Sequence, residues 1–265
     1  MVRAPGLISD RLPGSSSVSE IHGGHPALWS FSSRRGDPGI TFGCPSWAGH
    51  LGSILMATNE ELWAMIAEER LGLADLFDGL TEAQWSVPSL CEGWTVREVA
   101  AHLVTPFGQS LPRMMLKLAS YRFDFDRFAD TEARKNTMSG SELAASMREH
   151  KDYRFTPPGL GPIAPLTDVV VHGQDVRRPL GIDRELAPDR ARAILDFLAS
   201  PKATHGFVKR GHLNDLTWRC TDLGWSSGDG PVVQGPSEAV ILAMVGRSVA
   251  YGDLAGTGSD VLRSR

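Results

Sequence analysis

The sequence predicts a mostly α-helical protein, in which a bundle of four or five helices is followed by a small α/β segment. Between residues 56 and 200, apolar residues recur with the period of an α-helix. The stretches that connect them are polar and contain Pro and Gly, as in helical bundles. After residue 200, short runs alternate apolar and polar residues, which is typical of strands. We therefore expect a helical bundle over 56–200 and a small α/β domain over 201–265.

Residues 1–55 form a leader that is dominated by Gly, Ser and Pro. They keep neither a period of 2 nor one of 3.6, so we expect them to lack a packed structure. No charged segment leads into an apolar run, as a signal peptide would require. The composition changes abruptly at Met56. We therefore expect Met56 to be the natural start and the leader to be an upstream translation or a dispensable extension.

The first predicted helix follows Met56, where apolar residues lie on one side of a helical wheel and Glu and Arg on the other. The second covers 95–104, where Thr95 and Glu98 have the spacing of a capping box. Further helices are predicted over 139–152, over 165–178 with Pro165 at the first position, and over 188–200. Beyond them we expect a strand at 216–222, a Gly-Asp-Gly turn, a short strand at 231–235 and a helix at 236–246.

The composition excludes several classes of partner. A net charge of -4 without a dense basic cluster argues against nucleic acid. The three cysteines are far apart in the sequence and form no CxxC pair, so neither a disulfide framework nor a thiolate zinc site is indicated. No apolar run approaches the roughly 20 residues of a membrane span. We expect a cytoplasmic protein with small-molecule partners, no nucleic acid and no membrane; a monomer and a homodimer are both compatible with the sequence.

One predicted helix carries a polar stripe formed by Asp168, His172 and Asp175. Residues four apart on a helix are neighbours on one face. Valines cover the other sides of this helix, so the stripe is not simply its solvent face. His102 falls at the edge of the apolar side of the 95–104 helix and can meet the stripe if the two helices pack together. Two histidines and one carboxylate are the ligand set of a catalytic type of zinc site, and also of an Fe(II) site.

Less specific interpretations apply to the same residues. A histidine on a helix is commonly a hydrogen-bonded residue of the core. Asp175 either accepts a hydrogen bond from a ligand imidazole or pairs with Arg178. Cys91 adjoins the 95–104 helix and could approach the site, but we expect it to act as a small buried hydrophobe.

Three blocks of sequence carry a resemblance to a known family: PSLCEGWTVREVAAHLV, LTDVVVHGQDVRRPLGI and TDLGWSSGDGPVVQGPSEAVILAMVGR. In this order they resemble the mycothiol-dependent maleylpyruvate isomerase family. The resemblance implies a DinB-like four-helix bundle that holds a divalent metal, usually zinc, followed by a small α/β domain. It places the metal ligands at His102, Asp168 and His172. The family commonly has glutamate at the position of Asp168, so the metal would lie nearer that helix, or Asp175 would assist.

The resemblance also implies a mechanism in which mycothiol is the thiol cosubstrate and the metal holds it as a thiolate. In one alternative, the thiol adds to a maleylpyruvate-like substrate and is expelled once the substrate has isomerised. In the other, the thiol is transferred permanently to an electrophile. Arg247 is the first candidate to receive a substrate carboxylate, because its planar fork matches a carboxylate, and Arg219 is the second. Trp94 and Trp225 are candidates for lining the pocket. Arg247 could equally end a helix, and both tryptophans could equally belong to the core.

Three hypotheses about function follow. The first is a metal- and thiol-dependent enzyme, either an isomerase or a thiol S-transferase, and the sequence does not separate these two. The second is a non-catalytic metal- or thiol-binding regulatory module. The third, an Fe(II) oxygenase, is weakened because the sequence predicts too few strands for the β-sandwich on which such sites commonly lie.

Overall fold

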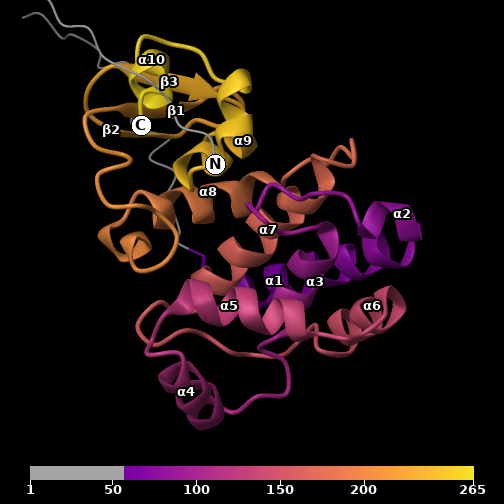
Figure 1. Ribbon diagram of the computed structural model, residues 1–265. Coiled ribbons are helices and arrows are strands. Elements are labelled where there is room, and N and C mark those ends of the chain that lie inside the picture. Colours follow the sequence, from indigo (N-terminus) through magenta and orange to yellow (C-terminus); the bar gives the residue numbers. More distant parts are fainter. Residues whose placement is uncertain (1–56) are drawn as a thin grey trace, which may run out of the picture. The chain divides into compact units, whose positions relative to one another are not determined.

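The computed structural model describes residues 57–265. The predicted leader, 1–55, therefore lies outside the described residues, as does the expectation about Met56. The described chain is mostly helical, with a small three-stranded mixed sheet near the C-terminus (Figure 1). This confirms the predicted fold class. Within residues 57–265, no helix has the length and apolarity that crossing a membrane requires.

Four helices form the bundle: α1 (Asn59–Asp78), α3 (Val96–Val104), α6 (Gly140–Glu149) and α7 (Ile163–Arg177). Helix α1 packs on α6 and α7, and α3 packs on the same two helices. Their facing sides bury apolar residues almost completely, including Ile66, Leu73, Val99, Leu143 and Leu166. The apolar periodicity read from the sequence is therefore the periodicity of this core.

The starts of the helices follow local capping signals. The predicted capping box at α3 forms, and Glu98 accepts a hydrogen bond of 2.8 Å from the backbone N–H of Thr95. The predicted first position of α7 was wrong, because the helix begins at Ile163 and Pro165 is its third residue. Proline fits there because the first four N–H groups of a helix have no partner within it.

The segment between α3 and α6 contains two helices that the sequence analysis missed, α4 (Leu111–Ser120) and α5 (Phe125–Lys135). Helix α5 packs on α3. Two short helices were also missed, α2 (Glu82–Trp85) and α10 (Ser259–Arg263). Of these four, α5 matters most for the site, because α3 carries His102.

The chain continues through α8 (Pro188–Leu198) and the 3-10 turn η1 (Pro201–Thr204) into the sheet. The predicted domain boundary falls between these two elements and stays a prediction. Strand β1 (Thr217–Cys220) pairs antiparallel with β2 (Ser226–Gly228) and parallel with β3 (Val232–Gly235), in the order β2-β1-β3. Strands β1 and β3 lie where strands were predicted, and β2 was not predicted. Helix α9 (Ser237–Met244) then packs on α8, and η2 (Ser248–Asp253) follows.

Glycine is required at the turn after β2. Gly228 and Gly230 have φ angles of 88° and 129°, in the region that favours glycine. A Cβ atom on Gly228 would lie 2.2 Å from the backbone oxygen of Leu216. The predicted Gly-Asp-Gly turn is therefore present for a steric reason.

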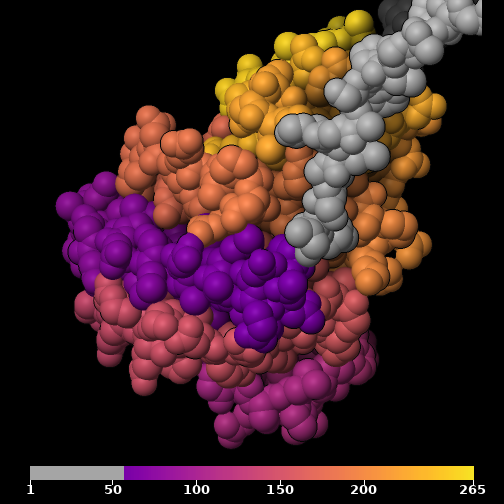
Figure 2. Space-filling model, turned by 180° about the vertical axis from the view of Figure 1, so that it is seen from behind, coloured from indigo at the N-terminus to yellow at the C-terminus, as the bar shows by residue number. Residues whose placement is uncertain are grey.

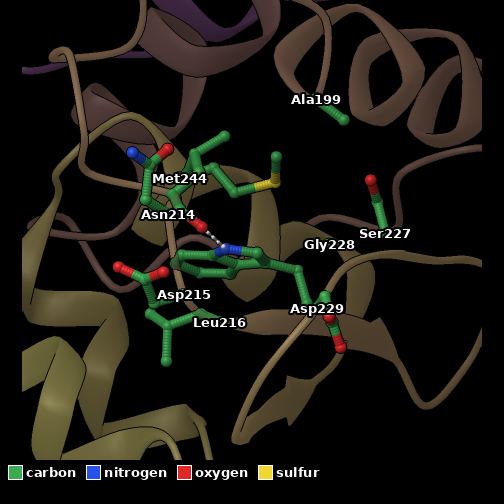
Figure 3. A pocket seen from close by; sticks show the side chains of 10 residues that line it. Ala199, Asn214, Asp215, Leu216, Ser227, Gly228, Asp229 and Met244 are labelled. Atoms are coloured by element: carbon green, nitrogen blue, oxygen red, sulfur yellow. Dashed lines mark hydrogen bonds between the residues drawn. The ribbon is translucent and has the colours of Figure 1, made fainter.

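The C-terminal part contains a cavity of about 400 Å³, part of whose lining is Asp215, Trp218, Ser227 and Met244 (Figure 3). The indole N–H of Trp218 donates to the backbone oxygen of Leu213, another lining residue, over 3.3 Å. No residue of the predicted metal site lines this cavity.

Candidate metal centre

The structure brings His102, Asp168 and His172 together. One ligand atom from each lies within 4.8 Å of the others. The Nε2 atoms of His102 and His172 are 3.8 Å and 3.5 Å from Oδ1 of Asp168. The predicted convergence of α3 and α7 is therefore present, and the binding of a metal at this point stays a prediction.

The packing of α7 explains why the polar stripe faces α3. Val169, Val170 and Val176 are buried at 3% exposure or less, and they hold the other sides of α7 in the core. Asp168 and His172, four residues apart, are thereby directed at His102. The two imidazole rings are 4.9 Å apart in an edge-to-face arrangement, which leaves both Nε2 atoms near the same carboxylate.

The three side chains are partly open to solvent. The exposed fractions are 24% for His102, 37% for Asp168 and 14% for His172, so a small molecule can approach the carboxylate. Burial raises the pKa of Asp168, but the two neighbouring imidazoles outweigh it and hold that pKa well below its usual range. Burial lowers the pKa of His172, but the Asp168 charge and hydrogen bonds to both aspartates raise it well above its usual value. The site thus favours positive charge between its carboxylates.

Behind His172 lies a carboxylate that is itself held by an arginine. The Asp175 side chain is fully buried, and its Oδ2 is 2.9 Å from Nδ1 of His172. Arg247, which follows α9, donates from Nε to Oδ1 over 3.0 Å and from Nη2 to Oδ2 over 2.8 Å. Although burial raises the pKa of Asp175, these contacts lower it below its usual range. Asp175 therefore contacts the His172 imidazole, whereas Arg178 pairs with Glu238 and Asp253. The role of Asp175 as the acceptor for a ligand imidazole stays a prediction.

Cys91 packs against the hydrophobic core and also makes polar contacts in this cluster. Its thiol donates to Oδ2 of Asp175 over 3.1 Å, and its sulfur lies 3.6 Å from Nδ1 of His172. Cys91, His172 and Asp175 form a second group of ligand-type atoms within 4.8 Å. Here, however, Nη2 of Arg247 lies 3.5 Å from the sulfur, so a metal cation would meet a guanidinium. The group with His102 and Asp168 is the better candidate.

Comparison with known families adds to this geometry. Residues 66–154 match the sequence model of the mycothiol maleylpyruvate isomerase N-terminal domain. The match confirms the resemblance for that part of the chain and includes His102. Asp168 and His172 lie beyond the matched residues, so the full ligand set rests on the geometry of the structure.

Two solved structures resemble the chain. One is a mutant of the mycothiol-dependent maleylpyruvate isomerase, with 14% sequence identity, a TM-score of 0.46, and coverage of 77% of this chain and 94% of that chain. The other is the mycothiol-dependent maleylpyruvate isomerase, with 15% identity, a TM-score of 0.42 and the same coverage. No curated protein matches the chain.

The remaining predicted site residues fall into two groups. Trp94, within the matched mycothiol maleylpyruvate isomerase N-terminal domain, has its ring 5.3 Å from that of His102 and 6.4 Å from that of His172. Trp225 is instead buried in the C-terminal part, where its indole N–H donates to Asp196 of α8 over 2.7 Å. Arg219 is exposed on β1. In the described part of the chain, neither Trp225 nor Arg219 makes a hydrogen bond or ring contact with the three candidate ligands.

Sequence reasoning missed Asp130, which contacts Trp94, and Arg134, which contacts Asp130. Asp130 of α5 accepts a hydrogen bond from the Trp94 indole over 2.9 Å, and Arg134 donates to Asp130 over 2.8 Å. A helix prediction for 125–135 would have shown Asp130 and Arg134 four residues apart on one face. It would not have shown that this face meets Trp94.

Proposed function

We propose that the chain is a metal-dependent enzyme that uses a low-molecular-weight thiol, mycothiol, to isomerise a maleylpyruvate-like substrate or to transfer the thiol to an electrophile. The observation that carries the proposal is the convergence of two imidazoles and one carboxylate at a partly exposed point of the bundle. The match of residues 66–154 to the mycothiol maleylpyruvate isomerase N-terminal domain supports the thiol and the reaction class.

The donor set fits a divalent metal, and zinc in particular. Nitrogen from histidine and oxygen from a carboxylate are zinc ligands, and three protein ligands leave a position for a further one. The hydrogen bond between His172 and Asp175 is the carboxylate contact that commonly orients a metal-binding imidazole. No lysine or arginine forms an ion pair with Asp168 among the described residues, so its charge is available to a cation.

The residues around the metal have separable roles in this proposal. A bound divalent metal would lower the pKa of a coordinated thiol, so that the thiol is held as the nucleophilic thiolate. Asp175 accepts a hydrogen bond from Nδ1–H of His172. Nε2 of His172, on the side of Asp168, is then free to bind the metal. Trp94 closes the apolar side of the site next to both rings.

Arg247 is proposed to orient Asp175 in addition to, or in place of, receiving a substrate carboxylate. Its Nε and Nη2 both donate to Asp175, and Nη1 lies 3.3 Å from the backbone oxygen of Val245. A substrate carboxylate would have to compete with Asp175 for this fork. The receiver role therefore stays a prediction, and the orienting role is the one that the contacts support.

A non-catalytic metal- or thiol-binding module is the alternative, because the geometry supports binding of a metal independently of turnover. The test measures both properties on the same samples. Purified protein should contain about one zinc per chain. It should also either isomerise maleylpyruvate only when mycothiol is present, or consume mycothiol in the presence of a small electrophile. Metal without turnover of either kind would favour the binding module.

Replacement of His172 with alanine should remove most of the metal, because only two of the proposed ligands would remain. His205→Ala is a matched control, since His205 is exposed and its Nδ1 contacts only the backbone oxygen of Lys202. If His172→Ala kept its full metal content, the ligand assignment would be wrong.

A further inference from the structure

The two histidines of the candidate metal centre are held in different ways. Nδ1 of His172 is held by the Asp175 carboxylate. Among residues 57–265, no group forms a hydrogen bond with Nδ1 of His102. Its ring instead lies against Trp94, with 5.3 Å between the centroids and 46° between the planes. Besides its contacts with Asp168 and His172, the His102 ring is therefore oriented by packing against this indole.

Trp94 is fixed at both its backbone and its ring. Its backbone oxygen accepts hydrogen bonds of 2.9 Å from both the N–H and the hydroxyl of Ser89. Gly93, with a φ angle of 76°, allows the turn that precedes it. The indole N–H donates to Oδ1 of Asp130 over 2.9 Å, and the indole is therefore tied to α5.

Arg134 completes this arrangement. It donates from Nε to Oδ1 of Asp130 over 2.8 Å and from Nη2 to the backbone oxygen of Gly93 over 2.8 Å. One side chain thus contacts both the partner of the indole and the residue before Trp94. Because Asp130 and Arg134 lie one helical turn apart on α5, the helix presents them to the Trp94 loop as a unit.

We infer that Asp130 and Arg134 are positioning residues of the metal centre, which act through Trp94 on the His102 imidazole. The inference rests on the proposed function only in assigning His102 as a metal ligand. A ligand imidazole that is free to rotate must be ordered when the metal binds, which weakens binding, and a packed indole removes that freedom in advance. For His102, Trp94 therefore does by packing what Asp175 does for His172 by hydrogen bonding.

The test is a titration with cobalt(II), which has an absorption spectrum that reports its ligand geometry and does not require turnover. Asp130→Leu, which removes the acceptor at similar size, should weaken cobalt binding by about 10-fold, at the low end of the effect of residues that orient metal ligands. Asp130→Asn should restore much of the affinity, because its amide oxygen still accepts the indole N–H. In a Trp94→Phe background, Asp130→Leu should have no further effect, because the contact is already absent.

The chain offers a matched control in the contact between Trp225 and Asp196. It is the same kind of hydrogen bond, 2.7 Å long, between an indole and an aspartate on a helix. Asp196→Leu should lower the melting temperature without changing cobalt affinity.

The possible results distinguish a failure of this inference from a failure of the proposed metal site. If wild type binds cobalt and Asp130→Leu binds it equally well, Asp130 has only a structural role and the inference is wrong. If Asp196→Leu weakens cobalt binding as much, the effect is a general loss of stability, and the inference is again wrong. If wild type binds no cobalt, the metal site itself fails and the inference fails with it.

Discussion

Asp175→Asn is the substitution that most directly tests how the candidate metal centre is supported. The aspartate side chain is fully buried and has the partners Arg247, His172 and Cys91. Asparagine preserves the shape but removes the charge. The guanidinium of Arg247, itself largely buried, would then lose its counter-ion.

The magnitude follows from the contacts. Removal of one partner from a buried ion pair costs roughly 3 to 5 kcal/mol. Part of the Arg247 side chain, 22%, is exposed, which screens the charge and favours the lower end, about 3 kcal/mol. The same substitution leaves His172 without its carboxylate, and the loss of such a contact typically weakens metal binding roughly 10- to 100-fold.

Two measurements on the same preparations test these values. Denaturant unfolding of the metal-free protein gives the free energy of unfolding, and competition with a chelator gives the zinc affinity. Zinc must be absent in the first experiment, because a ligand that binds only the folded state adds to the apparent stability. Wild-type values for both stability and zinc affinity in Asp175→Asn would refute the assigned role of Asp175.

Three further substitutions test separate features. Glu69 is buried between Arg184 and Arg190, where α1 lies against the chain that follows α7 (Figure 2). Burial raises the pKa of Glu69, but the two arginines outweigh burial and lower that pKa overall. The ion pairs of Glu69 therefore stabilise the fold at pH values above the unfolded pKa of about 4.3. This contribution is lost as the pH falls through the folded pKa. Glu69→Gln should therefore lower the melting temperature at pH 7, by roughly 10 °C, and by less below pH 4; an equal loss at both pH values would contradict the sign. Gly140→Ala should cost about 1 to 3 kcal/mol of unfolding free energy, because its Cβ would lie 2.6 Å from the Trp85 ring, and a neutral effect in denaturant unfolding would show that Trp85 can move. Asp168→Glu should retain zinc in elemental analysis, because the partly exposed carboxylate has room for one more methylene, whereas complete loss of zinc would show that the site requires aspartate.

The parts of the site that were predictable from the sequence are those that helical periodicity determines. Asp168 and His172 share a face of α7 because they are four residues apart, and His102 borders the apolar side of α3. The valines around α7 show that this face is turned inward. Convergence of the three side chains then needed only the packing of two neighbouring helices.

Contacts between distant parts of the chain were not predictable in the same way. Arg247 pairs with Asp175 across 72 residues, and no local pattern marks them as partners. From the sequence, Trp94 and Trp225 were equal candidates for lining the pocket or belonging to the core. Only the fold places one beside the histidines and the other against α8.

The position of Arg247 also changes how the two halves of the chain relate to the metal. The segment that matches the isomerase domain family ends at residue 154, yet the carboxylate that contacts His172 is paired with an arginine that follows α9. Gln174 and Arg178 of the α7 end contact Glu238 of α9 as well. A buried carboxylate without its counter-ion is costly, so displacement of α9 would alter Asp175 and, through it, the His172 ligand. Arg247 and Asp175 therefore link the candidate metal centre to the C-terminal segment, and we expect a ligand that binds Arg247 to change the metal affinity of the candidate site.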